Sequence, residues 1–216
     1  MINPDIIKKD IENLRSHLPT DVFIVAASKT RTVEDIKTAI GSGISIIAEN
    51  YVSEAKKKYK NLKDYFKNTK TEFHLIGPLQ SNKTKIAVEI FDMIQSVDRI
   101  KIINTIDKEA KKIKKIIPIL IQINIGNEPQ KSGCDIKDLP DLIDTASSLQ
   151  NVKLVGFMCI PPAGKDPTPY FKKMEELKRS YDVKILSMGM SDDYEKAIEY
   201  GSNMIRLGAV IFGPRE

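Results

Sequence analysis

The amino-acid sequence predicts an α/β protein, a single-domain (β/α)8 TIM barrel over residues 1–216 with an extra N-terminal helix. Short apolar runs rich in β-branched residues alternate with amphipathic helical stretches, and the pair recurs in steps of roughly 20 to 35 residues, as βα units do. Several runs, such as Ile119–Ile121, show no alternation of apolar and polar residues. Strands buried on both faces have this pattern, so the sheet is expected to be parallel.

The expected elements follow in chain order. A first helix is predicted over Pro4–His17, before any strand. Eight apolar runs are predicted to form the strands: Val22–Ala27, Ile44–Ala48, Glu72–Ile76, Met93–Val97, Ile119–Ile125, Lys153–Cys159, Val183–Met188 and Asn203–Leu207. Helices are predicted between them, among others over Val33–Ser42, Val52–Phe66 and Ile136–Leu149. Eight parallel strands close into a barrel, whereas a doubly wound sheet usually has fewer strands and a glycine-rich first turn, which this chain lacks.

The charge balance argues against a nucleic-acid-binding protein. The chain has 34 Lys and Arg against 29 Asp and Glu, a net charge of +5, and its lysines are spread along the predicted helices. Aromatic residues make up only 6% of the chain and tryptophan is absent, so platforms on which bases could stack are scarce. We expect a solvated, lysine-rich exterior and no nucleic-acid partner.

The cysteines and the apolar segments indicate a compartment. Cys134 and Cys159 lie far apart and neither has a CxxC partner, so neither a disulfide framework nor a metal site is expected. The N-terminus lacks a basic region followed by an apolar one, and no stretch approaches the roughly 18 apolar residues of a membrane span. These features predict a cytoplasmic protein with no membrane partner.

A lysine stands at the end of the first predicted strand. Chemistry in a TIM barrel takes place at the carboxyl ends of the strands, and Lys29 follows the run that ends at Ala27. A barrel mouth of low dielectric constant disfavours the ammonium form, which lowers the pKa of a lysine and frees its amine for Schiff-base chemistry. Most lysines at strand ends are only solvated, so position alone leaves both interpretations open.

The loops after the last two strands suit a phosphate group. Barrels commonly bind phosphate between the loops after strands seven and eight and the N-terminus of a short helix. Gly189 and Gly208 let the backbone approach an anion, Ser191 offers a hydroxyl, and the amides of Gly208 and Ala209 point at phosphate oxygens if a helical turn starts there. Alternatively, Ser191 is only the N-cap of the helix that carries Asp192 and Asp193, and the glycines are plain turn residues.

Arg206 lies inside the eighth predicted strand, between two apolar residues. A guanidinium there needs an acceptor, because its desolvation is otherwise costly. Two acceptors fit the sequence: a carboxylate such as Glu49, which would make a purely structural pair, or a ring nitrogen of a bound cofactor.

Six segments, which together span nearly the whole chain, form a larger pattern: Ala27–Thr30, Glu49–Val52, His74–Lys83, Lys131–Gly133, Met188–Asp193 and Arg206–Gly213. In this order they resemble the pyridoxal phosphate homeostasis protein family, whose barrel is related to the N-terminal domain of alanine racemase. The resemblance implies that the cofactor is pyridoxal 5′-phosphate.

The resemblance also implies which residues hold the cofactor. The family's Schiff-base lysine falls on Lys29. The remaining contacts fall on Ser191, Gly208 and Ala209 for the phosphate, on Arg206 opposite the pyridine nitrogen, and on Asn50, Met158 and Met188 beside the ring.

Two residues depart from the family pattern, and one histidine within it needs a separate interpretation. Ala209 stands where a threonine is frequent in the family, which removes a hydroxyl but keeps the amide, and Arg31 replaces a lysine. His74 belongs to a recognisable motif, but a histidine within a barrel strand is expected to be a hydrogen-bonded structural residue rather than a catalyst.

The implied function is intracellular pyridoxal phosphate (vitamin B6) homeostasis without established turnover. An arginine can only donate hydrogen bonds, so opposite the ring nitrogen Arg206 weakens the electron sink that carbanion chemistry needs. We therefore expect a carrier or buffer with no catalytic residues, whose partners are the cofactor and apo forms of enzymes that receive it.

Two alternatives belong to other classes. The first is a pyridoxal phosphate-dependent amino-acid racemase, which takes a second base from another domain across a dimer. Since we expect no second domain after strand eight, we expect a monomer that lacks this base. The second is a barrel that binds a phosphorylated sugar without any Schiff base, which follows from fold analogy alone.

Overall fold

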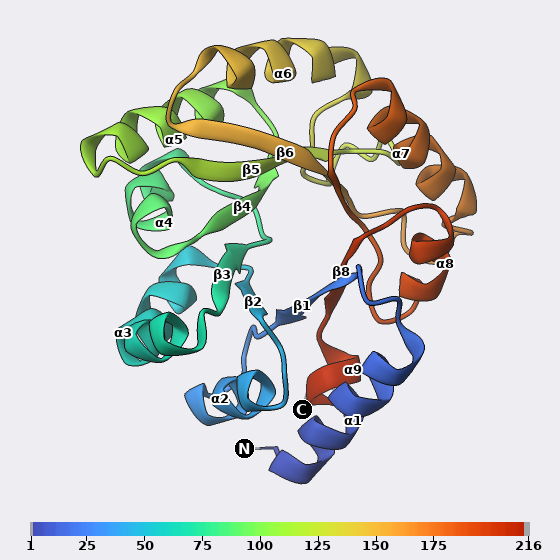
Figure 1. Cartoon of the computed structure of the whole chain (residues 1–216). Helices are drawn as coiled ribbons and strands as arrows, with labels where there is room; N and C mark the ends of the chain where they lie inside the picture. The colour runs from blue at the N-terminus through green and yellow to red at the C-terminus, as the bar shows by residue number, and fades with distance from the viewer. Residues whose placement is uncertain (1, 214–216) are drawn as a thin grey trace.

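Eight parallel strands form a closed barrel in the computed structural model, which describes residues 2–213, and they are hydrogen-bonded in the sequence order β1 to β8. Figure 1 shows the strands at the centre, surrounded by helices. Their bounds are Phe23–Ala27, Ile46–Glu49, Glu72–Leu75, Met93–Val97, Ile117–Ile123, Val152–Cys159, Ile185–Ser187 and Met204–Leu207. The predicted fold class is confirmed, and each strand overlaps one of the eight predicted runs.

The helices follow the strands around the outside of the barrel. Within the described residues they are α1 to α9, with bounds Pro4–His17, Val33–Gly41, Val52–Thr69, Thr84–Ile90, Ile100–Lys112, Leu139–Ser148, Thr168–Ser180, Tyr194–Glu199 and Ala209–Phe212. Two short 3-10 helices, η1 (Ser81–Lys83) and η2 (Ile136–Asp138), precede α4 and α6. In the described part of the chain, no helix is both long enough and apolar enough to span a membrane.

Local signals set where these helices begin and end. The helix predicted near Pro4–His17 is confirmed as α1, and at its N-cap the side chain of Asn3 accepts a hydrogen bond from the amide of Asp5. α3 runs three residues past its predicted end, and Lys70 then takes a left-handed conformation (φ 54°) that stops it. The predicted helix over 136–149 is divided into η2 and α6, and Pro140 stands in the first turn of α6, where its missing amide is not needed.

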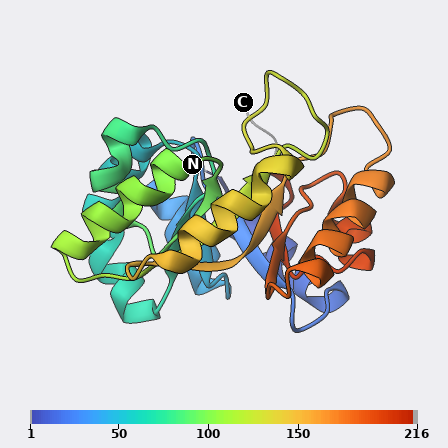
Figure 2. The same cartoon turned by 90° about the horizontal axis from the view of Figure 1, so that it is seen from above.

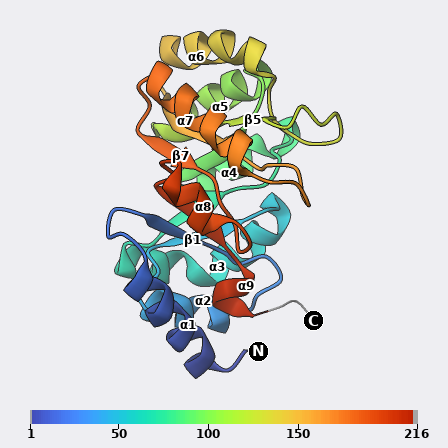
Figure 3. The same ribbon diagram turned by 90° about the vertical axis from the view of Figure 1, so that its right-hand side faces the viewer.

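Barrel closure joins the two ends of the chain. β1 pairs with β8 in parallel, with Val25 opposite Arg206 and Ala26 opposite Leu207. α1 contacts α9, and Figures 1 and 3 show these two helices side by side below the barrel. The loops after β5 and β6 rise from the rim formed by the carboxyl ends of the strands (Figure 2). Elements from both ends of the chain therefore complete the rim on which a site would lie.

The side chains divide into an outer and an inner core. The outer core packs helices against strands and includes Phe73, Phe157, Leu186 and Met188. A smaller apolar cluster fills the inside of the barrel and includes Val25, Leu120, Met158 and Met204. Between these inner apolar residues lie buried polar ones: His74, Gln95, Gln122, Ser187 and Arg206, each at most 5% exposed.

Candidate functional site

A cavity of about 320 Å³ opens at the carboxyl ends of the strands. Small-molecule sites usually measure roughly 300–1,000 Å³, so a compact ligand fits. Its walls come from β1, β8, the first residue of α9 and the loops that follow β1, β2, β3, β6, β7 and β8. They comprise Ala27, Lys29, Arg31, Asn50, Ile76, Ile160, Met190, Ser191, Asp192, Arg206, Gly208 and Ala209. Three cationic side chains and one carboxylate line it, which favours an anionic ligand.

Lys29 reaches this cavity from a tight turn after β1. Thr30 adopts a left-handed conformation (φ 67°), which turns the chain sharply just after the lysine. On the other side, Ser28 is fully buried, and its amide donates to the carbonyl of Ala48 at 2.9 Å. The turn is therefore held on both sides of Lys29.

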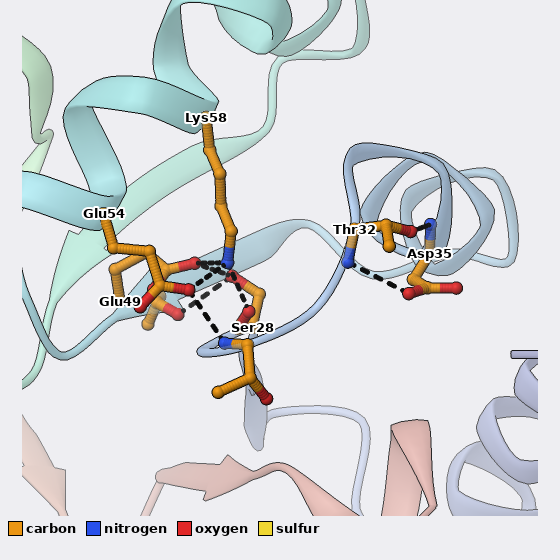
Figure 4. Close-up of polar contacts among 8 residues, drawn as sticks. Ser28, Thr32, Asp35, Glu49, Glu54 and Lys58 are labelled. Carbon is orange, nitrogen blue, oxygen red and sulfur yellow. Dashed lines mark hydrogen bonds and ion pairs between the residues drawn. The ribbon is translucent and has the colours of Figure 1, made fainter. Parts of the chain in front are cut away.

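An ion-pair cluster lies against the turn (Figure 4). The ammonium of Lys58, on α3, lies 2.6 Å from Glu49 Oε1, 2.8 Å from Glu54 Oε1 and 2.6 Å from the carbonyl oxygen of Ser28. Ser28 Oγ donates to Glu49 at 2.6 Å, and Glu54 accepts the amide of Thr30 at 2.8 Å. All three N–H donors of the Lys58 ammonium are thus used, and the cluster fixes the backbone turn that carries Lys29.

Burial controls the electrostatics of this cluster. Removal from water raises the pKa of the Glu49 carboxyl, and the charge of Lys58 opposes this rise. Burial also acts to raise the pKa of Glu54, but hydrogen bonds from Lys58 and from the amide of Thr30 outweigh it and lower that pKa. Glu49 is the side chain that sequence reasoning considered as a mate for Arg206. That pairing is wrong, because a helix lysine reaches Glu49 instead.

Arg206 is a buried cation at the wall of the cavity. Its Nη1 donates to Ser187 Oγ at 2.8 Å and its Nη2 to the carbonyl oxygen of Cys159 at 2.9 Å. Burial lowers the pKa of its guanidinium. Among the ion pairs of residues 2–213, none involves Arg206, so its charge is met only by neutral acceptors.

The loops after β7 and β8 meet at one end of the cavity. Ser191, Gly208 and Ala209 all line it, and Gly208 is the N-cap of the short helix α9. The first amides of a helix have no partner within the helix, so they suit an anion. The alternative role of Ser191 as a helix N-cap is wrong, since α8 starts at Tyr194 and its N-cap is Asp193.

Two glycines shape the walls. Gly189 has φ +95°, and a Cβ there would meet the side chain of Ala197 and the backbone of Tyr194, so only glycine fits this bend before Ser191. A Cβ on Gly77 would overlap the backbone carbonyl of Asn50. The close approach at Gly77 leaves Asn50 at the cavity wall, where its Oδ1 is buried and has no hydrogen-bond partner among the described residues.

Six of the eight predicted site residues line the cavity: Lys29, Asn50, Ser191, Arg206, Gly208 and Ala209. Met158 and Met188 do not. Met158 lies in the inner apolar cluster two residues before Ile160, and Ile160 lines the cavity in its place. Ser187 points inward, which turns Met188 outward into the outer core.

Sequence reasoning missed other wall residues. Arg31 follows the lysine turn by two residues, and its guanidinium donates to the carbonyl oxygen of Gly213 at 2.8 Å. Asp192 and Met190 flank Ser191 in the same loop. Arg31 could have been found from the sequence, because it is a cation two residues after the candidate lysine. Met190 and Asp192 could not, because their place at the wall depends on the bend of the chain at Gly189.

Comparison with known proteins identifies this class of barrel. Residues 2–216 match the alanine racemase N-terminal domain family. An alanine racemase of Clostridium difficile 630 superposes with a TM-score of 0.81 over 99% of this chain and 61% of that one; at 16% identity, this likeness shows the fold alone.

Nearer relatives define the family more narrowly. A pyridoxal phosphate homeostasis protein of Pasteurella multocida is 41% identical over 207 residues, covering 90% of this chain and 87% of its own. The structure of PipY from Synechococcus elongatus PCC7942, with pyridoxal phosphate bound, is 33% identical and has a TM-score of 0.88 over 96% of this chain and all of that one. The chain belongs to the pyridoxal phosphate homeostasis protein family.

The cavity fits such a cofactor. Its size suits one small aromatic ring with a phosphate, and its cations suit the negative charge. At the wall, the buried Asn50 Oδ1 has no hydrogen-bond partner within residues 2–213, as expected where a ligand supplies the missing contact, and the buried Arg206 guanidinium donates only to neutral acceptors.

Proposed function

We propose that this chain binds pyridoxal 5′-phosphate as a Schiff base on Lys29 and acts as a monomeric cytoplasmic carrier or buffer of the cofactor. One observation carries the proposal: a single cavity brings together Lys29, Ser191 and Arg206, which come from three separate strand ends. The cofactor supplies an aldehyde that reacts with amines and a ring that withdraws electrons. Both properties make a protein that sequesters it useful to the cell.

Each wall residue has a distinct task in this proposal. Lys29 forms the covalent link, and the Lys58 cluster holds its turn in place. Ser191 and the amides of Gly208 and Ala209 hold the phosphate. Asn50 meets polar substituents of the ring.

The surroundings of Arg206 favour a carrier over a racemase. Its guanidinium only donates hydrogen bonds, so it binds an unprotonated ring nitrogen and weakens the electron sink. Racemisation also needs a proton donor and an acceptor on opposite faces of the substrate carbon. Of the described residues at the wall, only Lys29 and Asp192 could exchange protons in this way, and Asp192 directly follows Ser191 in the loop that we assign to the phosphate, so we give it no role opposite Lys29.

The covalent link is tested by the absorption spectrum of the purified protein mixed with the cofactor. A visible band that borohydride abolishes is expected, and peptide mapping should then place the pyridoxyl group on the peptide that contains Lys29. Lys29→Ala should lose the band. The matched control is Lys83→Ala, because Lys83 lines a separate hollow beside Tyr51. A label mainly on Lys83 or Lys131 would contradict the assignment, and absence of any band would favour a sugar-phosphate site.

The carrier role needs a second experiment. Loaded protein is mixed with an apo transaminase, and recovery of transaminase activity is compared with recovery from the same concentration of free cofactor. Faster recovery supports delivery to apo enzymes. A chiral assay with D- and L-alanine runs alongside, and sustained racemisation near typical enzyme rates, roughly 1–10³ per second, that is lost in Lys29→Ala would establish the racemase instead.

A further inference from the structure

A row of hydrogen bonds crosses the inside of the barrel, away from the cavity. It starts at Arg206 and runs through side chains of β7, β4 and β3. Its four links are Arg206 Nη1 to Ser187 Oγ at 2.8 Å, Ser187 Oγ to Gln95 Oε1 at 2.7 Å, Gln95 Nε2 to His74 Nδ1 at 3.0 Å, and His74 Nε2 to Glu72 Oε2 at 2.8 Å.

The row connects the two ends of the barrel. Ser187, Gln95 and His74 are fully buried, whereas the side chain of Glu72, the first residue of β3, is 56% exposed at the opposite rim from the cavity. TIM-barrel interiors are ordinarily filled by branched apolar side chains. Burying these polar groups instead is costly unless each is bonded, and each of them is.

The direction of every bond in the row is fixed by the one beside it. Ser187 has a single proton and gives it to Gln95 Oε1, so its oxygen can only accept from Arg206. With its carbonyl used, Gln95 turns its amide nitrogen toward His74 Nδ1, which must accept. The proton of the His74 ring is then on Nε2, where it faces the carboxylate of Glu72.

We propose that Ser187, Gln95 and His74 are positioning residues that set the orientation and donor strength of Arg206 toward the ring of the bound cofactor. This inference rests on the proposed function of the cavity. Ser187, polarised by its bond to Gln95, accepts more strongly from Nη1 and holds the plane of the guanidinium at the cavity wall. Although His74 lies outside the cavity wall, it orients Gln95 and so acts on the cofactor through Gln95, Ser187 and Arg206.

The test compares two buried glutamines of the barrel interior. Gln95→Leu interrupts the row, while Gln122→Leu removes an amide of similar burial that donates to the Ser132 carbonyl and stands outside the row. Dissociation constants for pyridoxal phosphate and visible spectra are measured on the intact protein. Gln95→Leu should weaken binding about 2- to 10-fold, the effect of one hydrogen bond, and should shift the band. Equal effects of the two variants would overturn the inference.

Two further variants separate positioning from packing. His74→Asn keeps an acceptor that Gln95 can reach and should retain the native spectrum, whereas His74→Leu should shift the band as Gln95→Leu does. In a Ser187→Ala background, where the row is already cut, Gln95→Leu should add no further shift. If its effect is unchanged in that background, the row does not act on Arg206 and the inference is wrong.

The ligand-free protein offers an independent readout. Nitrogen NMR shifts of the His74 ring should show a proton on Nε2 and an acceptor at Nδ1, and a proton on Nδ1 would contradict the bond directions. Different results would contradict the proposed function and the positioning role. If the wild-type protein gives no Lys29-dependent band, the proposed function fails. If it gives the band but Gln95→Leu and His74→Leu match Gln122→Leu, only the positioning role fails.

Discussion

The carboxylate of Glu49 and the ammonium of Lys58 lie 2.6 Å apart, with Glu49 fully buried and Lys58 11% exposed at its side chain. A strand residue and a helix residue thus form the ion pair that supports the turn of Lys29. Buried pairs of this kind contribute little net stability relative to apolar residues, yet loss of one partner leaves an uncompensated charge.

Lys58→Met should therefore lower the free energy of unfolding by about 3–5 kcal/mol, measured by urea denaturation. The double variant Lys58→Met with Glu49→Gln should recover part of this loss, because position 49 then no longer carries a fully buried charge. Lys8→Met is the control, since the Lys8–Glu12 pair on α1 is separated by 4.0 Å and both side chains are 64% exposed. A change as small as that of the control would show that the Glu49 pair is not desolvated.

Ser191→Ala should weaken binding of pyridoxal phosphate by about 1.5–3 kcal/mol, the range for a hydrogen bond to a charged group. Titration of the visible band measures this. Ser53→Ala, in a separate hollow beside Tyr51, is the control and should bind normally. Pyridoxal, which lacks the phosphate, should bind wild type and Ser191→Ala equally poorly; a large effect of the substitution on pyridoxal binding would mean that Ser191 contacts another part of the ligand.

Acid should weaken the folded state partly through Glu72. The hydrogen bond to His74 lowers the pKa of Glu72 below its ordinary value of 4.5. A depressed carboxyl pKa contributes stability that is present above pH 4.5 and is lost as the pH falls through the folded-state value. Because Glu72 is half-exposed, the contribution should be below about 1 kcal/mol.

Glu72→Gln should accordingly flatten the fall of unfolding free energy below pH 4.5, measured by denaturant titrations at several pH values. Glu12→Gln removes the same charge from the exposed face of α1 and serves as the control. Identical pH profiles for the two variants would refute the role of the His74 contact.

The two cysteines should be unreactive in the folded protein. Burial raises the pKa of both Cys134 and Cys159 to about 12, so their thiols stay protonated at pH 8. A colorimetric disulfide reagent should detect almost no thiol in buffer and two per chain in concentrated urea. Rapid reaction of one thiol without urea would show that its surroundings open readily.

Strand positions could be predicted because buried parallel strands are apolar on both faces, and this property is local. The first and last residues of each strand are harder to predict. β2 begins at Ile46 and β7 at Ile185, two residues after the predicted start in each case, because pairing with neighbouring strands decides where a strand begins. β5 begins at Ile117, before its predicted start, and includes Pro118 at its second position.

Lys29 and Arg206 could be singled out because each lies at or close to the end of a predicted strand, and the structure places both at the wall of the cavity. Met188 shows the limit of this reasoning, since a shift of one residue along a strand reverses the direction of a side chain. The partner of Glu49 shows another limit. Lys58 lies on a helix, nine residues further along the chain, and only the packing of α3 against the barrel brings the two together.

Closure of the barrel by β1 and β8 also sets the moment at which the cavity comes into being during synthesis. Lys29 and Asn50 leave the ribosome early, and Arg206 follows Asn50 by 156 residues (206 − 50). At translation rates of about 5–20 residues per second, this interval lasts roughly 8 to 30 seconds. In the function proposed above, a nascent chain therefore has its Schiff-base lysine long before it has the loops assigned to the phosphate. Stable capture of the cofactor would then be confined to molecules that have completed their barrel.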